Sequence, residues 1–485
     1  ADHGCPSDYL TVNGTKYCGT SGPSGAVAED GVIEWRSDGI VVKSGWKICW
    51  ATRPPTLPPA PPPPPSPPAP PLSPPSPPQP PSPPPLPPLS PGYDVAAASE
   101  DQLRNLIEEA TITAANVSIY LPPGAEFKLS SQIICTSTIK VTVASSGEGA
   151  TLDGQGETGL FYLRGGCSLT LRGLTLVNGT AKYGGVVYAN GAGDVEIIES
   201  TVSDCSARQS GGVVFAQSSG AVSITSSNVT GCSADRYGGV VSTAFSGAVS
   251  IIESNVAGCS ARRQGGVVHA ENIGAEIAVS IIGSTVANCS TTERGAGGGV
   301  VSAGESNAVS IIDSAMTGCS ADSGGVVYVL NRPSDDPHKV SANSGAVSIT
   351  GSTMAGCSAG MYGGVVYAWG SESLFVARAD FINNRADGPG SVLYLDTIEQ
   401  TSISNASFTG NYGVTIQTQN SPIDWACRLG HWMPTEGAIK GDFNAPECYP
   451  CSAGYFGNTS GLTNSSCSGQ CTKGHYCKKG TADPE

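Results

Sequence analysis

Short apolar runs alternate with glycine and small polar residues through the middle of the chain, and they recur at a regular interval. The run Gly-Gly-Val-Val starts at residues 184, 211, 238, 265, 298, 324 and 363, so the first four copies are 27 residues apart. Each copy is followed by a run such as Ala-Val-Ser-Ile (221–224) and then by one such as Val-Thr-Gly-Cys (229–232). β-Branched residues favour strands, and strands this short bury a face only by stacking on further copies. The pattern predicts an all-β, right-handed parallel β-helix of three sheets over residues 93–420.

Alternation along Gly-Gly-Val-Val-X-Ala predicts which side chains face outward. Neighbouring residues of a strand point to opposite faces, and X is variable (Tyr188, His269 and Ser302, for example). We therefore expect X and the first valine outside, with the second valine inside. An exposed apolar row of this size is typical of an interface, here for a second copy or for a Pro-rich rod, and a row shielded by glycans is the alternative. The row comprises Val186, Val213, Val240, Val267, Val300, Val326 and Val365.

Six cysteines occupy equivalent places in successive repeats: Cys205, Cys232, Cys259, Cys289, Cys319 and Cys357. Asn178, Asn384 and Asn411 hold that place at the two ends. Equivalent residues of stacked coils lie ~4.8 Å apart, a distance that allows disulfides. Stacked side chains point the same way, however, which favours a column of buried free thiols. We expect the asparagines to form an internal hydrogen-bonded ladder.

The repeat also carries a family resemblance. Gly-Gly-Val-Val, together with Phe-Ile-Asn-Asn (381–384) and Phe-Thr-Gly-Asn (408–411), resembles the repeats of polymorphic membrane proteins, which pair G-G-A-[ILV] with F-x-x-N. In six middle coils Val or Met replaces Phe, and Cys replaces Asn. The resemblance covers residues 165–415. It implies a β-helix, and its members are mostly surface and adhesive proteins.

Two features adjoin the repeats. Residues 99–110 predict an amphipathic helix that caps the first coil, since Ser99 and Gln102 form a capping-box pattern and Leu103, Leu106 and Ile107 share one face. Insertions at 291–297 and 331–344 extend the repeat. Long loops on a rigid scaffold are frequent functional sites, and a tolerated insertion is the alternative.

Residues 1–52 predict a small β-rich unit. Cys5-Pro-Ser-Asp8, Tyr17-Cys18-Gly19, a Trp before Ser37-Asp38, and Gly45-Trp46 resemble the second half of a CUB domain. The resemblance implies a Cys5–Cys18 disulfide. It also implies calcium at Asp8 and Asp38, although the glutamate that completes that site has no counterpart; two loop aspartates are the alternative. No other cofactor is expected.

Residues 53–92 are dominated by proline, with 25 prolines among positions 54–91. Proline fixes φ and removes the N–H, so the segment predicts a polyproline II rod. It resembles the hydroxyproline-rich glycoproteins of green algae and plants, and a bare spacer or a ligand for aromatic grooves are the alternatives. The resemblance implies hydroxylation and O-glycosylation at Pro61, Pro62, Pro63, Pro64, Pro65, Pro67, Pro68, Pro74, Pro75, Pro77, Pro78, Pro80, Pro81, Pro83, Pro84 and Pro85.

Residues 421–485 form a Cys-rich module. Cys448-Tyr-Pro-Cys451 and the later Cys467, Cys471 and Cys477 resemble extracellular modules with repeated C-x-x-C-x-x-G-[YF]. Disulfides are favoured over a zinc site because the chain also carries N-glycosylation sequons. Seventeen cysteines and eight sequons indicate a secreted, extracellular protein. The sequons are at Asn13, Asn116, Asn178, Asn228, Asn288, Asn405, Asn458 and Asn464.

Net charge and the placement of reactive side chains disfavour several classes of function. The net charge is −15, which disfavours nucleic acid and anionic membranes as partners, and no apolar run is long enough to span a bilayer. The five histidines fall in separate segments, so no catalytic cluster is evident and we expect no enzyme activity. We expect a structural glycoprotein that self-assembles into a fibre or matrix layer. A surface adhesin or glycan-binding protein is the alternative, followed by a polysaccharide lyase or hydrolase.

Overall fold

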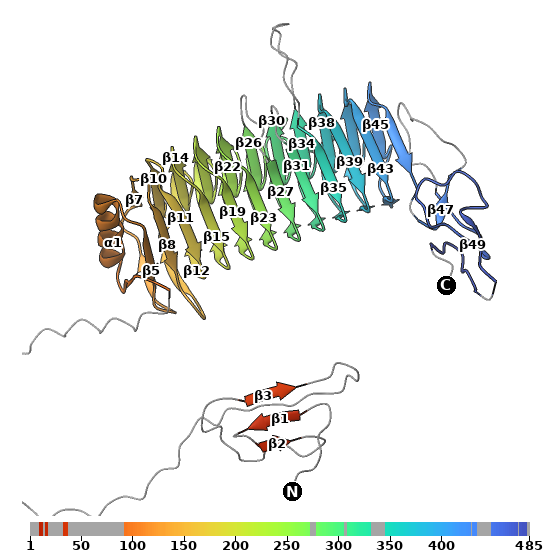
Figure 1. Cartoon of the computed structure of the whole chain (residues 1–485). Coiled ribbons are helices and arrows are strands. Elements are labelled where there is room, and N and C mark those ends of the chain that lie inside the picture. The colour runs from red at the N-terminus through yellow and green to blue at the C-terminus, as the bar shows by residue number, and fades with distance from the viewer. Residues whose placement is uncertain are drawn as a thin grey trace, which may run out of the picture. The chain divides into compact units, whose positions relative to one another are not determined.

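A computed structural model gives the structure of the chain (Figure 1). The described residues are 9–12, 15–17, 33–36, 92–271, 278–304, 308–330, 345–427, 429–433, 448–473 and 475–482. The chain divides into two units, Ala1–Ser82 and Pro83–Glu485.

Three strands are described in the N-terminal unit, inside the predicted β-rich segment. β1 (Tyr9–Val12), β2 (Thr15–Tyr17) and β3 (Ile33–Arg36) form an antiparallel sheet in the order β2-β1-β3. The predicted Cys5–Cys18 pair, the predicted calcium ligands Asp8 and Asp38, Asn13 and the prolines between positions 61 and 85 lie outside the described residues.

The larger unit is a parallel β-solenoid, as the repeat predicts. The strands form four long sheets rather than three, and the middle coils contribute one strand to each of them. The first sheet, which contains the second valine of every Gly-Gly-Val-Val, has eleven strands. These are β7 (Ile133–Cys135), β10 (Phe161–Arg164), β14 (Val187–Asn190), β18 (Val214–Gln217), β22 (Val241–Ala244), β26 (Val268–Glu271), β30 (Val301–Gly304), β34 (Val327–Leu330), β38 (Val366–Trp369), β42 (Leu393–Asp396) and β45 (Ile416–Gln419).

The second and third sheets follow along each coil. The second consists of β4 (Val95–Ala96), β5 (Val117–Tyr120), β8 (Lys140–Ala144), β11 (Ser168–Arg172), β15 (Val195–Ile198), β19 (Val222–Thr225), β23 (Val249–Ile252), β27 (Ala278–Ile282), β31 (Ala308–Ile312), β35 (Val347–Thr350), β39 (Ser373–Ala377), β43 (Gln400–Ser404) and β46 (Ile423–Ala426). The third consists of β6 (Glu126–Lys128), β9 (Ala150–Asp153), β12 (Leu174–Val177), β16 (Thr201–Ser203), β20 (Asn228–Thr230), β24 (Asn255–Ala257), β28 (Thr285–Ala287), β32 (Ala315–Thr317), β36 (Thr353–Ala355), β40 (Asp380–Ile382) and β44 (Ser407–Thr409).

The fourth sheet was not predicted, because several of its strands contain two residues and carry mostly serine and alanine. It consists of β13 (Thr180–Tyr183), β17 (Ser206–Ser210), β21 (Ser233–Ala234), β25 (Ser260–Ala261), β29 (Ser290–Thr291), β33 (Ser320–Ser323), β37 (Ser358–Tyr362) and β41 (Arg385–Ala386). It lies between the cysteine of one repeat and the next Gly-Gly pair, so it forms an additional corner with the first sheet.

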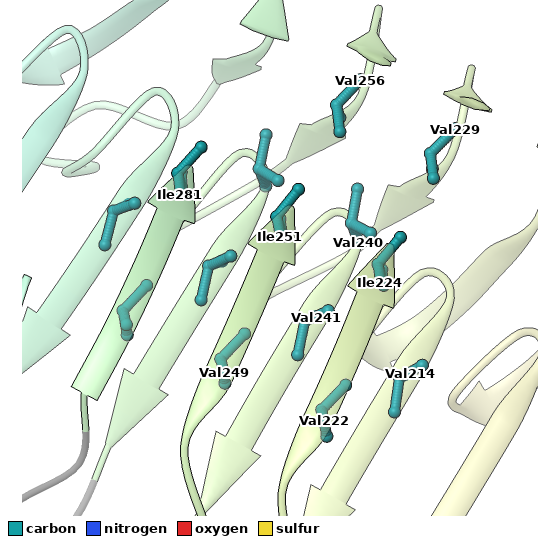
Figure 2. Packing of buried hydrophobic residues seen from close by; sticks show 14 of the residues in the cluster. Val214, Val222, Ile224, Val229, Val240, Val241, Val249, Ile251, Val256 and Ile281 are labelled. Carbon is teal, nitrogen blue, oxygen red and sulfur yellow. The ribbon is translucent and has the colours of Figure 1, made fainter. Parts of the chain in front are cut away.

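Successive coils pair in register, so several lanes of the core repeat the same residue from coil to coil. Val214 and Val241 are Cα partners in the first sheet, and Ile224 and Ile251 are partners in the second. Figure 2 shows these side chains stacked in rows from coil to coil, and all four are fully buried. Burial of such a side chain contributes about 1.5–3 kcal/mol. The repeated valines and isoleucines therefore account for one continuous core.

The predicted exterior valine row is wrong. The main-chain N–H groups of Val240 and Val241 both donate to the carbonyl oxygen of Val267, at 3.0 and 2.9 Å. Two residues of one coil thus oppose one of the next, which interrupts the alternation as a bulge does. The first valine lies at the corner before the strand, and its side chain turns inward beside the second. The first valine of all seven repeats is fully buried: Val186, Val213, Val240, Val267, Val300, Val326 and Val365.

A column of buried serines closes the corner between the second and third sheets. The hydroxyl of Ser227 donates to the carbonyl of Thr225 at 2.8 Å and accepts the N–H of Ser200 at 3.1 Å. This pattern satisfies polar groups that would otherwise be buried without partners. Each of the remaining serines also accepts an N–H from the preceding coil: Ser254, Ser284, Ser314 and Ser352.

Both ends of the solenoid core are covered. Helix α1 (Glu100–Thr113) caps the first coil with Leu103 and Ile107 fully buried, which confirms the predicted capping helix and extends it by three residues. Its N-cap Ser99 accepts from the N–H of Gln102, while the Gln102 side chain accepts from Ala98 rather than from Ser99. At the other end, the core cluster includes Trp425, Cys427 and Met433.

The C-terminal module is held by disulfides, as predicted. Its strands are β47 (His431–Trp432), β48 (Tyr449–Pro450), β49 (Tyr455–Phe456) and β50 (Gly469–Gln470), and they form two antiparallel pairs. A further disulfide, Cys135–Cys167, joins two early coils. The bridges of the module are Cys427–Cys448, Cys451–Cys467 and Cys471–Cys477.

Candidate functional site

The outer corner between the first and fourth sheets carries a row of ring side chains. In β14, Val187 and Ala189 belong to the core, whereas Tyr188 between them lies on the outer face and is half-buried. Where the residue before a Gly-Gly pair is aromatic, as at Tyr183, Tyr237 and Tyr362, its ring contacts this face. We call the positions aligned with Tyr188 the outer row: Tyr162, Tyr188, Phe215, Ser242, His269, Ser302, Tyr328, Tyr367, Tyr394 and Gln417.

Aromatic rings stack at the N-terminal end of the outer row. The ring centroids of Tyr162 and Tyr188 lie 4.9 Å apart, and those of Tyr188 and Phe215 lie 5.7 Å apart. Tyr183 stacks on Phe215 of the next coil at 4.8 Å. Register therefore converts one aromatic per repeat into a continuous aromatic surface.

A second aromatic cluster occupies the C-terminal end. Tyr367 lies between Tyr328 and Tyr394, at centroid distances of 5.0 and 5.2 Å, and Tyr362 packs on Tyr394 at 4.9 Å. Burial, followed by the neighbouring tyrosines Tyr328 and Tyr394, raises the pKa of Tyr367 to about 12. The Tyr367 hydroxyl is therefore neutral at physiological pH.

Between the two clusters the outer row becomes polar. Ser242, His269 and Ser302 are consecutive Cα partners in β22, β26 and β30. The His269 ring stacks on Tyr237 with centroids 4.7 Å apart and an interplanar angle of 20°. The small side chain of Ser302 leaves space that a ring fills elsewhere in the row.

Two adjoining hollows lie at this polar section. One of about 250 Å³ is lined by Tyr237, Arg263, Gln264, Glu293 and the start of the following loop. The other, of about 200 Å³, is lined by Gln264, His269, Glu271, Ser302 and Tyr328, among others. Both are smaller than the 300–1,000 Å³ typical of sites for drug-sized ligands, so each suits a small unit.

The insertion at 291–297, which the sequence left open as a functional loop or a tolerated insertion, lies beside the first hollow. Glu293 accepts from Arg263 at 3.1 Å, and Glu293, Arg294 and Gly295 line the cavity. The second insertion, 331–344, lies outside the described residues. One of the two insertions therefore borders the candidate site, and a role for it stays a hypothesis.

The glycosylation sequons are distributed along the chain without converging on this corner. Some asparagine side chains already make hydrogen bonds: Asn178 donates to Asp153 at 2.9 Å, and Asn228 accepts from Asn255 at 2.8 Å. Those at Asn116, Asn288, Asn458 and Asn464 are exposed, and those at Asn178, Asn228 and Asn405 are half-buried.

The cysteine column is confirmed as free, buried thiols. Each sulfur donates to the carbonyl two residues earlier; for Cys259 the acceptor is Ala257 at 3.6 Å. Hydrogen bonding with the neighbouring thiol Cys259, together with burial, raises the pKa of Cys289. The column comprises Cys205, Cys232, Cys259, Cys289, Cys319 and Cys357.

The asparagine ladder is confirmed at one end of the column only. Asn384 is fully buried and bonds to both Cys357 and Asn411. At the other end the prediction is wrong, because the register Val177–Ser203 aligns Gly179, not Asn178, with Cys205. Asn178 instead takes a left-handed turn with φ +52° and bonds outside the column.

The two hollows beside the outer row were not predicted from the sequence. The variable X residues were placed outside, and this is what the first sheet shows. Without the fourth sheet, however, nothing indicated that Tyr183, Tyr237 or Tyr362 would face them. Recurring aromatics just before the Gly-Gly pairs were the available signal.

Two kinds of feature are absent from the part of the chain that the structure describes. No group of three or more His, Cys, Asp or Glu side chains there is arranged to hold a metal ion. No helix among them is long and apolar enough to cross a bilayer.

No known protein family matches the chain, and no curated protein matches it. Among solved structures, it is similar to the crystal structure of PfbA, a surface adhesin of Streptococcus pneumoniae. The TM-score is 0.34 and the sequence identity 10%, over 68% of this chain and 86% of that chain. A similarity this remote does not establish a shared function.

Proposed function

We propose that this chain is a secreted structural glycoprotein of a cell-surface or matrix layer, without enzyme activity, in which the solenoid is a rigid spacer. The observation that supports this role is the in-register stacking of identical residues along the core and along the serine column. Such a ladder resists bending because every coil is bonded to both neighbours. The sequons and the disulfides of the C-terminal module are consistent with an extracellular setting.

We further propose that the Pro-rich segment is hydroxylated and glycosylated as in green-algal and plant wall proteins, and that the chain self-assembles. The valine row does not supply the contact, because it is buried. Strand-to-strand growth at the ends is also disfavoured, since α1 covers the first coil and Trp425 and Met433 join the core at the last. Assembly is therefore expected through lateral surfaces, the N-terminal unit or the Pro-rich segment.

Electron microscopy and analytical ultracentrifugation of the secreted, glycosylated chain test this proposal. We expect filaments or layers whose formation depends on protein concentration. An enzymatically deglycosylated sample shows whether glycans take part. A glycosylated protein that remains monomeric up to millimolar concentration would contradict the structural role.

A second candidate function is glycan binding at a cell surface, and the outer row favours it. The rings of the outer row stack on one another, so they offer their edges and hydroxyl groups to a sugar, and the adjacent polar groups select its hydroxyls. Binding to an array of neutral and acidic oligosaccharides tests this function. The absence of any binding would exclude it.

A further inference from the structure

The polar section of the outer row contains an unusual side chain. His269 is nine-tenths buried, with 7% side-chain exposure, yet neither ring nitrogen has a hydrogen-bond partner among the described residues. The Glu271 carboxylate lies 3.8 Å from Nε2, longer than a hydrogen bond. Buried polar atoms without partners are uncommon, and each calls for a partner such as an ordered water, an ion or a ligand.

The repeat itself does not require histidine at this position. The aligned residues on the two neighbouring coils are Ser242 and Ser302, both buried. Histidine therefore replaces a small residue at the middle of the row, where its ring borders the 200 Å³ hollow. Serine fills this position in both neighbouring coils, so packing alone does not explain the histidine.

The groups around this hollow define the chemistry of a ligand. Gln264 and Glu271 line the same space as His269, so donors and acceptors are both available. Tyr237 stacks behind His269, and Tyr328 borders the hollow on the next coil but one. A ligand with a flat apolar face and several hydroxyls matches this combination, because a hydroxyl both donates and accepts.

Charge selects among such ligands. The nearby His269 lowers the pKa of Glu271, so this carboxylate is ionised near neutral pH. No Arg or Lys is among the described residues that line this hollow, whereas Arg263 and Arg294 line the adjoining one, where Arg263 is paired with Glu293. An ionised carboxylate without a dedicated cation disfavours acidic sugars by like-charge repulsion.

We propose that the hollow at His269, Gln264 and Glu271 binds one neutral sugar ring of a longer glycan, whose neighbouring rings lie on the flanking aromatic clusters. This inference rests on the second candidate function, glycan binding. His269 supplies a hydrogen bond to a sugar hydroxyl, and Glu271 accepts one. The aromatic clusters add affinity without selecting the sugar.

The test uses the full secreted chain with a neutral galactan tetrasaccharide and, as the acidic counterpart, a galacturonan tetrasaccharide, in titration calorimetry. His269→Ser restores the residue of the neighbouring coils and should leave the melting temperature unchanged. We expect the wild type to bind the neutral probe and His269→Ser to lose at least tenfold in affinity. Ser223→Ala, on the outer side of β19 and away from the corner, is the matched control and should bind normally.

A second readout follows the histidine directly. In protein labelled with ¹⁵N-histidine, the ring nitrogens of His269 should shift on addition of the neutral probe. Unchanged affinity in His269→Ser overturns the subsite while glycan binding stands. Preference for the acidic probe overturns the charge argument and the proposal with it. Binding of neither sugar, or of only a peptide with the sequence of residues 54–91, overturns both the subsite and the glycan-binding function.

Discussion

The main-chain N–H of Cys357 donates a hydrogen bond to the side-chain Oδ1 of Asn384, 2.9 Å away. The same amide donates through Nδ2 to the carbonyl of Met354 at 2.9 Å. At this point the column changes from thiols to amides, and a single side chain serves two buried main-chain groups of the preceding coil.

Asn384→Ala should therefore be strongly destabilising. It leaves the N–H of Cys357 and the carbonyl of Met354 buried without partners, and each such group costs about 1–3 kcal/mol. We expect the free energy of unfolding to fall by about 3 kcal/mol in urea titrations. Asn411→Ala, half-buried at the last coil, should cost less because water can replace its bonds. Equal losses in the two variants would contradict this account.

The six column thiols should be unreactive in the folded protein. All are buried, and the thiolate is the reactive form. Iodoacetamide at pH 8, followed by peptide mass spectrometry, should label none of the six in native buffer and all of them in 6 M guanidinium without reductant. Labelling of Cys259 under native conditions, or failure to label it after unfolding, would show that the column is open or bridged.

Stability should fall as the pH rises above about 8.5, where thiols of the unfolded chain ionise. Hydrogen bonding with neighbouring thiols, together with burial, raises the pKa values of Cys232, Cys259 and Cys289 in the folded state. The folded chain therefore keeps protons that the unfolded chain releases, and each thiol weakens folding by up to about 1.4 kcal/mol per pH unit. Urea titrations from pH 7 to pH 10 measure this slope. In Cys259→Ala, the free energy of unfolding should fall less steeply with pH. An unchanged slope would show that the column thiols do not cause the loss of stability.

Val240→Lys should prevent or severely impair folding. Val240 is fully buried, and an unpaired ammonium in an apolar core costs more than about 4 kcal/mol. Ser223→Lys, on the outer face of β19, should fold with a melting temperature close to that of the wild type. Circular dichroism melting curves compare the two. If Val240→Lys folds like the wild type, the side chain at this position faces solvent, and the inward position of the valine row is wrong.

Gly266→Ala should be far more harmful than Gly258→Ala. A methyl group on Gly266 would penetrate the carbonyl oxygen of Gly299 on the next coil, whereas one on Gly258 meets nothing within 4 Å. Gly258 has φ +63°, so its substitution costs about 1 kcal/mol from backbone strain alone. Urea midpoints of the two variants measure the difference. Equal effects would mean that coils can move apart to accept a side chain.

The lanes of the core were predictable because they depend on repetition. Identical residues 27 positions apart, such as Val214 and Val241, stack wherever a coil closes, and the capping pattern at Ser99 is local. The direction of a side chain at a corner was not predictable from alternation. Val240 turns inward because its N–H shares an acceptor with that of Val241, a feature that only coil-to-coil bonding creates.

The candidate site was harder to predict than the core. The outward position of His269 follows from the pattern, but its neighbours come from other coils and from a sheet whose strands are as short as Ser260–Ala261. The stacking of Tyr237 on His269 depends on the angle of the corner between the sheets. That angle has no signature in the order of residues.

The close contact at the paired glycines determines the spacing between coils as well as the stability of the solenoid. A carbonyl oxygen of one coil occupies the place that a methyl group on the glycine of the preceding coil would take. The distance between successive coils is therefore fixed. Anything attached to the outer bends, whether a sugar or a loop, is consequently held at whole multiples of about 4.8 Å. Inserting or deleting one 27-residue unit would therefore move every later attachment point along the solenoid axis by one coil spacing, about 4.8 Å.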